Sequence, residues 1–177
     1  MKPAFAHRIA YLGCAAALAV ASTGFAAVAH AAAGASASEP AYGPELEGFD
    51  YPAPVKQFNF TSQGVKLHMA YMDIAAQGKA NGRTVVLMHG KNFCGATWKA
   101  SMDALSGAGY RVVVPDQVGF CKSSKPQHYQ YTFQQLAANT RALLESIGVK
   151  NATILGHSTG GMLATRYGLM FPQLTEQ

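Results

Sequence analysis

A serine within a glycine-rich segment is the residue of this chain whose setting most clearly favours chemistry. Residues 156–160 read Gly-His-Ser-Thr-Gly, with an apolar run at 152–155 before them and a helix-like segment at 162–170 after them. A strand–turn–helix of this kind holds a serine hydroxyl exposed on a sharp turn, where a base can take its proton. The crowded turn also requires small residues two positions to either side. The pattern predicts that Ser158 is a nucleophile; the alternative is an incidental serine in a glycine-rich turn.

The partners that a nucleophilic serine needs are not found after it in the chain. Only 19 residues follow Ser158, none of them is Asp or His, and Glu176 is the only acid among them. If the base and its acid belong later in the chain than the serine, we expect this chain to lack both.

The first 33 residues are predicted to be a secretory signal peptide. Lys2 and Arg8 form a basic start, an alanine-rich apolar stretch spans 9–28, and two Ala-x-Ala cleavage motifs lie within 29–33. The stretch is nearly long enough to anchor the chain in a membrane, but its small, weakly apolar residues favour removal. We therefore expect an exported protein, periplasmic or secreted, with no stable membrane insertion once the signal is removed.

The remainder is expected to be one domain behind a short linker. Residues 34–54 are rich in Ala, Ser, Gly and Pro and are predicted to form a linker or a surface arm, which leaves 55–177 as the domain. Of the 14 basic residues two lie in the signal, so 12 basic and 9 acidic residues give a net charge of +3. This mild charge forms no basic stripe, so nucleic acid is not an expected partner. No residue spacing suits a metal ion, and no cofactor is expected.

Short apolar runs mark the predicted strands. A hairpin is predicted from 55–61 and 65–74, and three further runs lie at 84–88, 110–114 and 152–155. Runs rich in β-branched residues that do not alternate with polar ones are typical of strands buried on both faces, as in a parallel sheet.

Helical patterns separate the last three of these runs. Apolar residues recur at helical spacing from Trp98 to Leu105, and a second apolar face extends over 133–147. Thr132 and Gln135 predict a capping box at the start of the second helix. Strands that alternate with helices indicate an α/β fold.

Three loops that carry polar and glycine residues follow the three buried runs, at 89–94, 116–124 and 156–161. The carboxyl ends of parallel strands meet at one edge of a sheet, where ligands bind, so we expect one site from the three loops. Cys94 and Cys121 lie in the first two loops and could meet there. A disulfide and two free thiols both remain open, and for an oxidising compartment we predict the disulfide.

The three loops resemble those of the α/β-hydrolase superfamily, which includes serine hydrolases such as esterases and lipases. The matching positions are His89-Gly90, then Asp116, Gly119 and Ser123, then the elbow at 156–161. The resemblance covers about residues 55–172 and implies a mostly parallel sheet with helices on both faces. Because the family takes its triad acid and histidine from segments after the elbow, it also implies an N-terminal portion truncated after the elbow helix.

The resemblance assigns roles to residues of the expected site. Ser158 would be the nucleophile. The backbone N–H of Thr159 would be one donor of the oxyanion hole, helped by the positive end of the following helix. The second donor would come from the loop after the His-Gly pair, with the N–H of Lys91 as first choice and that of Asn92 as second. Phe93 is a candidate for contact with the substrate.

Other side chains of the loops are expected to act indirectly. His89 could contact substrate or serve as a base, but the His-Gly pair in this fold usually shapes the oxyanion loop. His157 is expected to pack, because a turn that projects Ser158 points its neighbour elsewhere. Asp116 is expected to brace its loop through backbone hydrogen bonds, by analogy with the family, and Trp98 to be core.

The expected function is that of a serine hydrolase. It would act on an ester or a related small-molecule acyl substrate through an acyl-enzyme on Ser158, and the chain as given would lack its triad acid and histidine. Serine at the elbow argues against relatives with an aspartate nucleophile, such as dehalogenases and epoxide hydrolases. The alternatives are a catalytically inactive truncated binding module and a cofactor-free relative of haloperoxidase or acyltransferase type.

Overall fold

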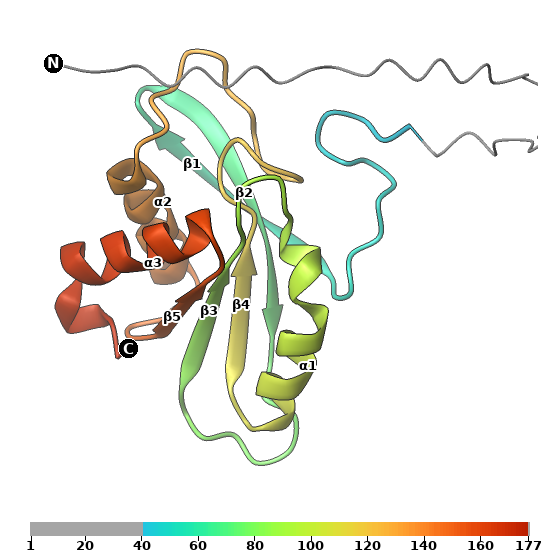
Figure 1. The fold of residues 1–177 in the computed structure, drawn as a ribbon, viewed down its shortest axis with the longest axis vertical. Coiled ribbons are helices and arrows are strands. Elements are labelled where there is room, and N and C mark those ends of the chain that lie inside the picture. The colour runs from blue at the N-terminus through green and yellow to red at the C-terminus, as the bar shows by residue number, and fades with distance from the viewer. Residues whose placement is uncertain (1–40, 177) are drawn as a thin grey trace, which may run out of the picture. The chain divides into compact units, whose positions relative to one another are not determined.

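The computed structural model describes residues 41–176 (Figure 1). The predicted signal peptide, 1–33, and the first residues of the predicted linker lie outside the described residues. The described residues belong to one compact unit, which includes residues 41–54 of the predicted linker.

A five-stranded sheet forms the centre of this unit. Its strands are β1 (Val55–Ser62), β2 (Val65–Ile74), β3 (Thr84–Met88), β4 (Arg111–Pro115) and β5 (Thr153–Gly156). The spatial order is β1-β2-β4-β3-β5; β2 is antiparallel to β1 and β4, and β3 is parallel to β4 and β5. Each predicted strand is present within one residue of its expected bounds. The mostly parallel α/β fold is therefore confirmed.

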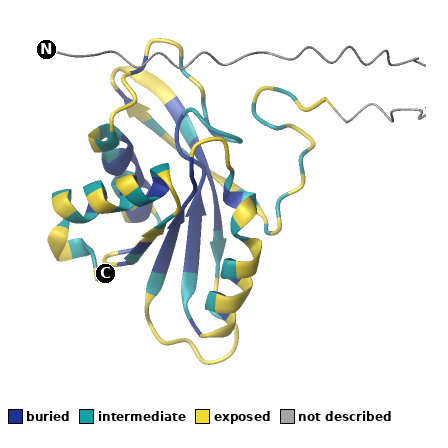
Figure 2. Cartoon of the chain, viewed as in Figure 1, coloured by how far each residue is buried: buried dark blue, intermediate teal, exposed yellow. Residues whose placement is uncertain are grey.

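Helices cover both faces of the sheet (Figures 1 and 2). The helical elements are η1 (Gly95–Trp98), α1 (Lys99–Gly107), α2 (Phe133–Ser146), α3 (Thr159–Met170) and η2 (Pro172–Leu174). On one face, Met102 of α1 joins a buried cluster with Leu87 and Val112; on the other, Leu143 of α2 and Tyr167 of α3 join a second cluster. Burial from both sides explains why β3 and β4 are apolar without alternation.

Two helix starts differ in detail from the expectations. Thr132 Oγ1 accepts a hydrogen bond from Gln135 N at 3.1 Å, but the Gln135 amide bonds to Asn139 Oδ1 at 3.0 Å, so only half of the capping box forms. Helix α3 begins at Thr159, three residues earlier than its apolar residues suggest. It starts directly after the turn at Ser158.

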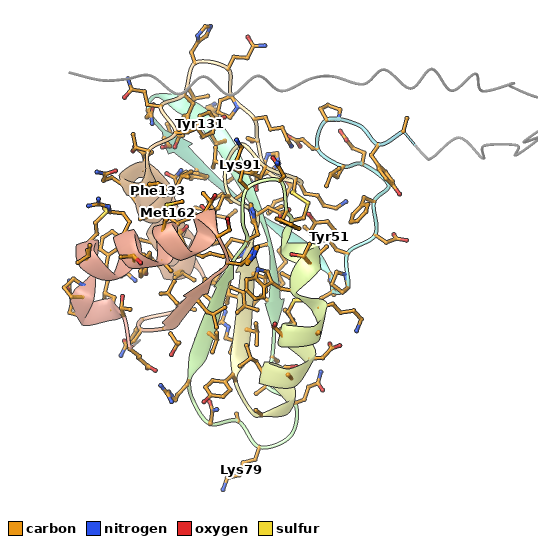
Figure 3. The ribbon with its side chains drawn as sticks, viewed as in Figure 1. Tyr51, Lys79, Lys91, Tyr131, Phe133 and Met162 are labelled. Atoms are coloured by element: carbon orange, nitrogen blue, oxygen red, sulfur yellow. A yellow bond between two sulfur atoms is a disulfide. The ribbon has the colours of Figure 1, made fainter. Side chains whose placement is uncertain are left out.

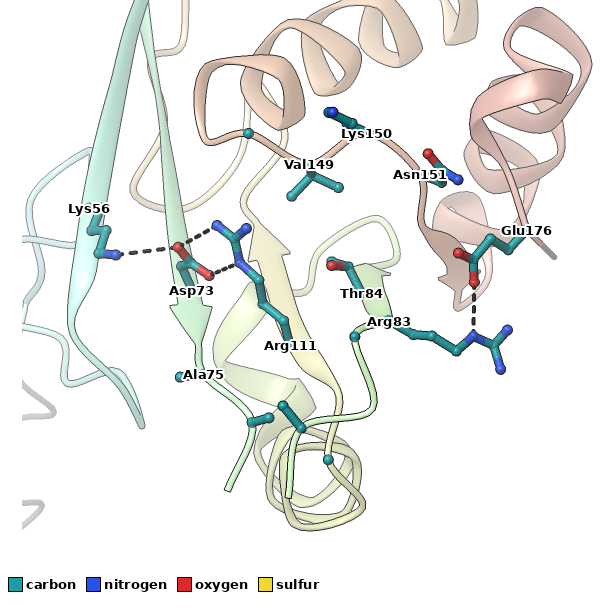
Figure 4. A pocket seen from close by; sticks show the side chains of 15 residues that line it. Lys56, Asp73, Ala75, Arg83, Thr84, Arg111, Val149, Lys150, Asn151 and Glu176 are labelled. Carbon is teal, nitrogen blue, oxygen red and sulfur yellow. Dashed lines mark hydrogen bonds and ion pairs between the residues drawn. The ribbon is translucent and has the colours of Figure 1, made fainter. Parts of the chain in front are cut away.

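An ion-pair cluster links the hairpin to the parallel strands at the amino ends of β3 and β4 (Figure 4). Arg111 Nε and Nη2 lie 2.9 and 3.0 Å from the two carboxylate oxygens of Asp73, and Lys56 Nζ lies 3.4 Å from Oδ2. These side chains line a hollow of ≈ 700 Å³ at the end of the sheet opposite the three loops. The hydrogen bonds from Arg111 lower the pKa of Asp73, while burial opposes the shift.

We expect Asp73→Asn to lower the free energy of unfolding by roughly 1 kcal/mol at pH 7, because a charge-assisted pair is lost. A carboxyl whose pKa is depressed in the folded state stabilises it above the ordinary pKa and loses this effect as the pH falls through the folded pKa. The loss should therefore shrink below the ordinary value of 3.8. Urea unfolding at pH 7 and pH 3 measures it. Asp103→Asn, which removes an exposed pair with Lys99, is the control and should cost less. A cost for Asp73→Asn that is equal at both pH values would contradict the assignment.

The outer side of β5 is open over most of its length in residues 41–176. Ala152 N donates to Leu174 O at 3.1 Å and Glu176 N donates to Ala152 O at 3.0 Å, so a parallel segment covers only the start of this strand. Because backbone groups alternate in direction along a strand, those of Ile154 and Gly156 face the same side. They have no partner strand among the described residues.

We expect the purified chain to associate, because an apolar edge strand pairs readily with other chains. Size-exclusion chromatography with light scattering should show oligomers. Leu155→Lys, which places a charge at an exposed position of this edge, should raise the monomer fraction. A monodisperse monomer of the unaltered chain would show that the edge is protected.

Candidate active site

Ser158 lies on the turn between β5 and α3 with a backbone conformation that L-residues rarely adopt, φ 55° and ψ −121°. The side chain is exposed. A Cβ at Gly156 would overlap the carbonyl oxygen of Gly160, and a Cβ at Gly160 would overlap that of Met88. The turn therefore requires both glycines. The sequence argument of a crowded turn explains Gly156, whereas Gly160 is required because the end of β3 lies against it. Such strain at an exposed polar residue is typical of functional sites.

The start of α3 leaves one backbone donor free beside Ser158. Gly160 N bonds to His157 O at 2.9 Å, and Gly161 N bonds to Ser158 O at 2.8 Å. Among the hydrogen bonds of the described residues, the N–H of Thr159 has no acceptor. A free N–H at the positive end of a helix can stabilise a developing negative charge.

The loop after β3 lies directly against this turn. A Cβ at Gly90 would lie 3.0 Å from His157 Nδ1 and 3.2 Å from the Cβ of Ser158, so the backbone approaches closely only because this residue is glycine. Phe93 N bonds to Gly90 O at 3.1 Å, and within the described residues the N–H of Lys91 has no acceptor. Lys91, the first choice for the second oxyanion donor, thus lies in the loop that contacts the nucleophile.

A cleft of ≈ 400 Å³ adjoins both candidate donors. Lys91 and Thr159 line it together with Phe120, Tyr131 and Phe133. Figure 3 shows Lys91, Tyr131 and Phe133 gathered at this end of the sheet. The loops after β3, β4 and β5 each contribute residues to this cleft, so they converge as predicted. Asn92, the second choice for a donor, has φ 65° in the same loop.

His89 is buried and has both ring nitrogens in hydrogen bonds. Gln117 N donates to Nε2 at 3.0 Å, so Nδ1 carries the proton and donates to Gly90 O at 2.9 Å. Burial lowers the pKa of His89, which keeps the ring neutral. The residue therefore holds the loop after β3 to the loop after β4 and has no nitrogen free to serve as a base.

His157 differs from the expectation that it is packed away. Its side chain is exposed and meets Phe93 edge-on, with ring centroids 5.6 Å apart and planes at 84°. Phe93 is itself 46% exposed at the same rim. The Ser158 hydroxyl makes no capping hydrogen bond to the start of α3. Among residues 41–176 the histidine that lies beside a carboxylate is His68, whose Nε2 is 3.2 Å from Glu45 Oε2.

Asp116 braces the loops rather than facing the site. Its carboxylate is 1% exposed. Oδ1 accepts from Gly95 N at 2.7 Å, and Oδ2 accepts from Lys122 N at 3.1 Å and from the Tyr51 hydroxyl at 2.6 Å. The two hydrogen bonds from backbone N–H groups agree with the expectation that Asp116 braces its loop. The sequence analysis did not predict the hydrogen bond from Tyr51. The presence of aromatic residues within the proline-rich segment 34–54 could have indicated that this segment packs against the domain.

Cys94 and Cys121 form a disulfide, with Cα atoms 5.7 Å apart. The bridge links the loop after β3 to the loop after β4, next to the two amides that Asp116 binds. Trp98 is partly buried and packs against the core cluster that contains Leu87 and Val112, as expected. It also borders a small cavity shared with Phe93 and His157.

Neither a metal centre nor a membrane span is found in the part of the chain that the structure describes. No group of three His, Cys, Asp or Glu side chains there could hold a metal ion. No helix there is long and apolar enough to cross a bilayer.

Residues 83–174 match the family described as "alpha/beta hydrolase fold". The chain belongs to this family. A probable hydrolytic enzyme from Pseudomonas aeruginosa PAO1 superposes with a TM-score of 0.76 at 65% identity, over 77% of this chain and 44% of that one. The α/β-hydrolase resemblance drawn from the loops is thereby confirmed.

Curated relatives extend the comparison. An epoxide hydrolase of Caballeronia sordidicola is 31% identical over 124 residues, which are 70% of this chain and 36% of the relative. An AB hydrolase superfamily protein of Bacillus subtilis is 32% identical over 66% of this chain and 39% of its own length. This α/β hydrolase chain thus spans less than half the length of the relatives it matches.

Proposed function

We propose that this chain is the nucleophile-bearing part of a serine hydrolase that acts on an ester or a related small-molecule acyl substrate. The observation that carries the proposal is the strained, exposed conformation of Ser158 at the amino end of α3. The free N–H groups of Thr159 and Lys91 support it.

The chemistry follows from this arrangement. The hydroxyl of Ser158 attacks the carbonyl carbon, and its proton passes to a base. The carbonyl oxygen becomes an oxyanion that accepts hydrogen bonds from the N–H groups of Thr159 and Lys91. The leaving alcohol takes the proton, and water then hydrolyses the acyl-enzyme. His89 is fully hydrogen-bonded and Asp116 is committed to loop contacts, so neither supplies the base or its acid.

The serine also favours one substrate class over another within the family. Attack by Ser158 on an epoxide carbon would leave an alkyl ether on the enzyme, which has no carbonyl for water to attack. Attack on an ester leaves an acyl group that water can remove. The epoxide hydrolase relative therefore supports the fold, while the nucleophile favours acyl substrates.

Fragment complementation tests the proposal. The chain is produced together with the portion of the Pseudomonas aeruginosa enzyme that lies beyond the matched region, and p-nitrophenyl acetate hydrolysis is measured. We expect turnover with a transient acetyl group on the Ser158 peptide, detected by mass spectrometry. Ser158→Ala should reduce the rate by about 10⁴-fold or more. Thr165→Ala, which removes another exposed hydroxyl of α3, is the control. Turnover that survives Ser158→Ala would contradict the proposal.

A further inference from the structure

The loops after β3 and β4 are linked twice, at adjacent positions. Cys94 and Cys121 are joined by the disulfide. The next residue in each loop, Gly95 and Lys122, donates its backbone N–H to the carboxylate of Asp116. The covalent link and the carboxylate link therefore hold the same two segments.

The segment 41–54, called the arm here, adds a third contact to this carboxylate. The Tyr51 hydroxyl donates to Asp116 Oδ2 at 2.6 Å. Lys122 Nζ lies 5.0 Å from the centre of the Tyr51 ring and donates to Leu46 O at 2.9 Å. Figure 3 shows Tyr51 of the arm beside the end of the helix at which α1 starts. The arm is thus attached to the active-site loops rather than being a passive linker.

In this contact the neutral phenol of Tyr51 donates a hydrogen bond to the buried carboxylate of Asp116. Burial, followed by the hydrogen bond to Asp116, raises the pKa of Tyr51 above its ordinary value of 10.0. The phenol consequently keeps its proton and donates throughout the physiological pH range. A buried carboxylate that loses a donor loses stabilisation that nothing else replaces, so removal of this hydroxyl weakens the carboxylate link.

We propose that Tyr51 is a positioning residue for the loop 89–94, acting through Asp116 in energetic coupling with the Cys94–Cys121 disulfide. Lys91 lies three residues before Cys94, and Asn92 between them has φ 65°, so the donor conformation depends on how firmly the end of the loop is held. The effect of this positioning on catalysis rests on the proposed function. The coupling between the Tyr51 contact and the disulfide does not depend on that function.

Coupling between two links is reciprocal. If the disulfide keeps Gly95 and Lys122 in place for Asp116, the carboxylate contacts favour formation of the disulfide by the same factor. A hydrogen bond contributes roughly 0.5–1.5 kcal/mol net. Because the proposal makes the Tyr51 contact depend on the intact disulfide, loss of the Tyr51 hydroxyl should make the disulfide about two- to tenfold easier to reduce.

The first experiment measures the reduction equilibrium. The chain is isolated from an oxidising compartment, and alkylation before and after reduction establishes that both cysteines are blocked. Redox titration in glutathione buffers then compares the unaltered chain with Tyr51→Phe and with Tyr42→Phe. Tyr42 is an arm tyrosine, 43% exposed, whose hydroxyl makes no hydrogen bond among the described residues. We expect a shift of two- to tenfold for Tyr51→Phe and none for Tyr42→Phe.

The second experiment asks whether the loop itself responds. Hydrogen exchange of the hydrogen-bonded amides of Phe93, Gly95 and Lys122 should be faster in Tyr51→Phe, and faster still when Cys94→Ala and Cys121→Ala are added, while exchange in α2 stays unchanged. An effect through global stability would instead raise exchange in α2 as well. Unchanged α2 exchange also shows that each variant is folded.

Several results would overturn the proposal. One is an unaltered reduction equilibrium in folded Tyr51→Phe, and another is faster exchange confined to the arm. If Tyr51→Phe does not fold, Lys122→Met removes the contacts with the Tyr51 ring and Leu46 but keeps the backbone donors. It should shift the equilibrium in the same direction, and no shift would overturn the proposal. These measurements need no turnover, so they are independent of whether Ser158 proves to be a nucleophile.

Discussion

The chain alone is expected to hydrolyse p-nitrophenyl acetate no faster than its own Ser158→Ala variant. The reason is the absence, within residues 41–176, of a histidine that could accept the proton of Ser158 while an acid orients it. Both nitrogens of His89 are hydrogen-bonded, and His157 meets Phe93 rather than a carboxylate. Without its base a triad serine loses about 10⁴-fold or more in rate.

The measurement is steady-state hydrolysis by the purified chain, with Ser158→Ala and buffer alone as references. A rate comparable to that of an intact esterase, abolished by Ser158→Ala, would show that a base exists within the chain. His157 is the exposed histidine nearest in sequence to the nucleophile, and His157→Gln would then test it directly. Loss of that rate in His157→Gln would assign the base.

Gly160→Ala is expected to lower the free energy of unfolding by about 3 kcal/mol or more. Its Cβ would overlap the carbonyl oxygens of Met88 and His89. Both atoms belong to backbone at the end of β3, which cannot move without disturbing the sheet, and overpacking of this kind costs at least as much as in a side-chain core.

Gly161→Ala is the matched control one residue further along α3. Its Cβ would meet Gly156 O at 3.4 Å, an ordinary contact, and alanine favours a helix over glycine by roughly 1 kcal/mol. Urea unfolding of the two variants should therefore give effects of opposite sign. Equal stability of both variants would show that the elbow is less crowded than the structure indicates.

Local sequence patterns were sufficient for much of the fold. The apolar runs at 84–88 and 152–155 predicted buried strands because burial on both faces removes the need for alternation. Thr132 predicted the start of α2 because a threonine hydroxyl can accept the hydrogen bond of a free amide at a helix start. The glycines at 156 and 160 predicted a sharp turn; the crowding at Gly156 comes from neighbouring backbone, whereas that at Gly160 comes from the end of β3.

The roles assigned to Ser158, Thr159 and Lys91 remain predictions, as do the signal peptide at 1–33 and export. Membership of the α/β-hydrolase family is established for the part of the fold that this chain spans, and the chemistry of the whole protein remains a proposal.

The sequence by itself indicated the strands, the main helices and the sharp turn at Ser158, because their patterns involve residues a few positions apart, although the end of β3 is what requires glycine at position 160. Only the tertiary structure decided which distant residues meet. Tyr51 reaches Asp116 across 65 positions, and His89 receives its hydrogen bond from a residue 28 positions later. Such contacts depend on the strand order β2-β4-β3-β5, which places the loops after β3 and β4 side by side, and no local pattern encodes that order.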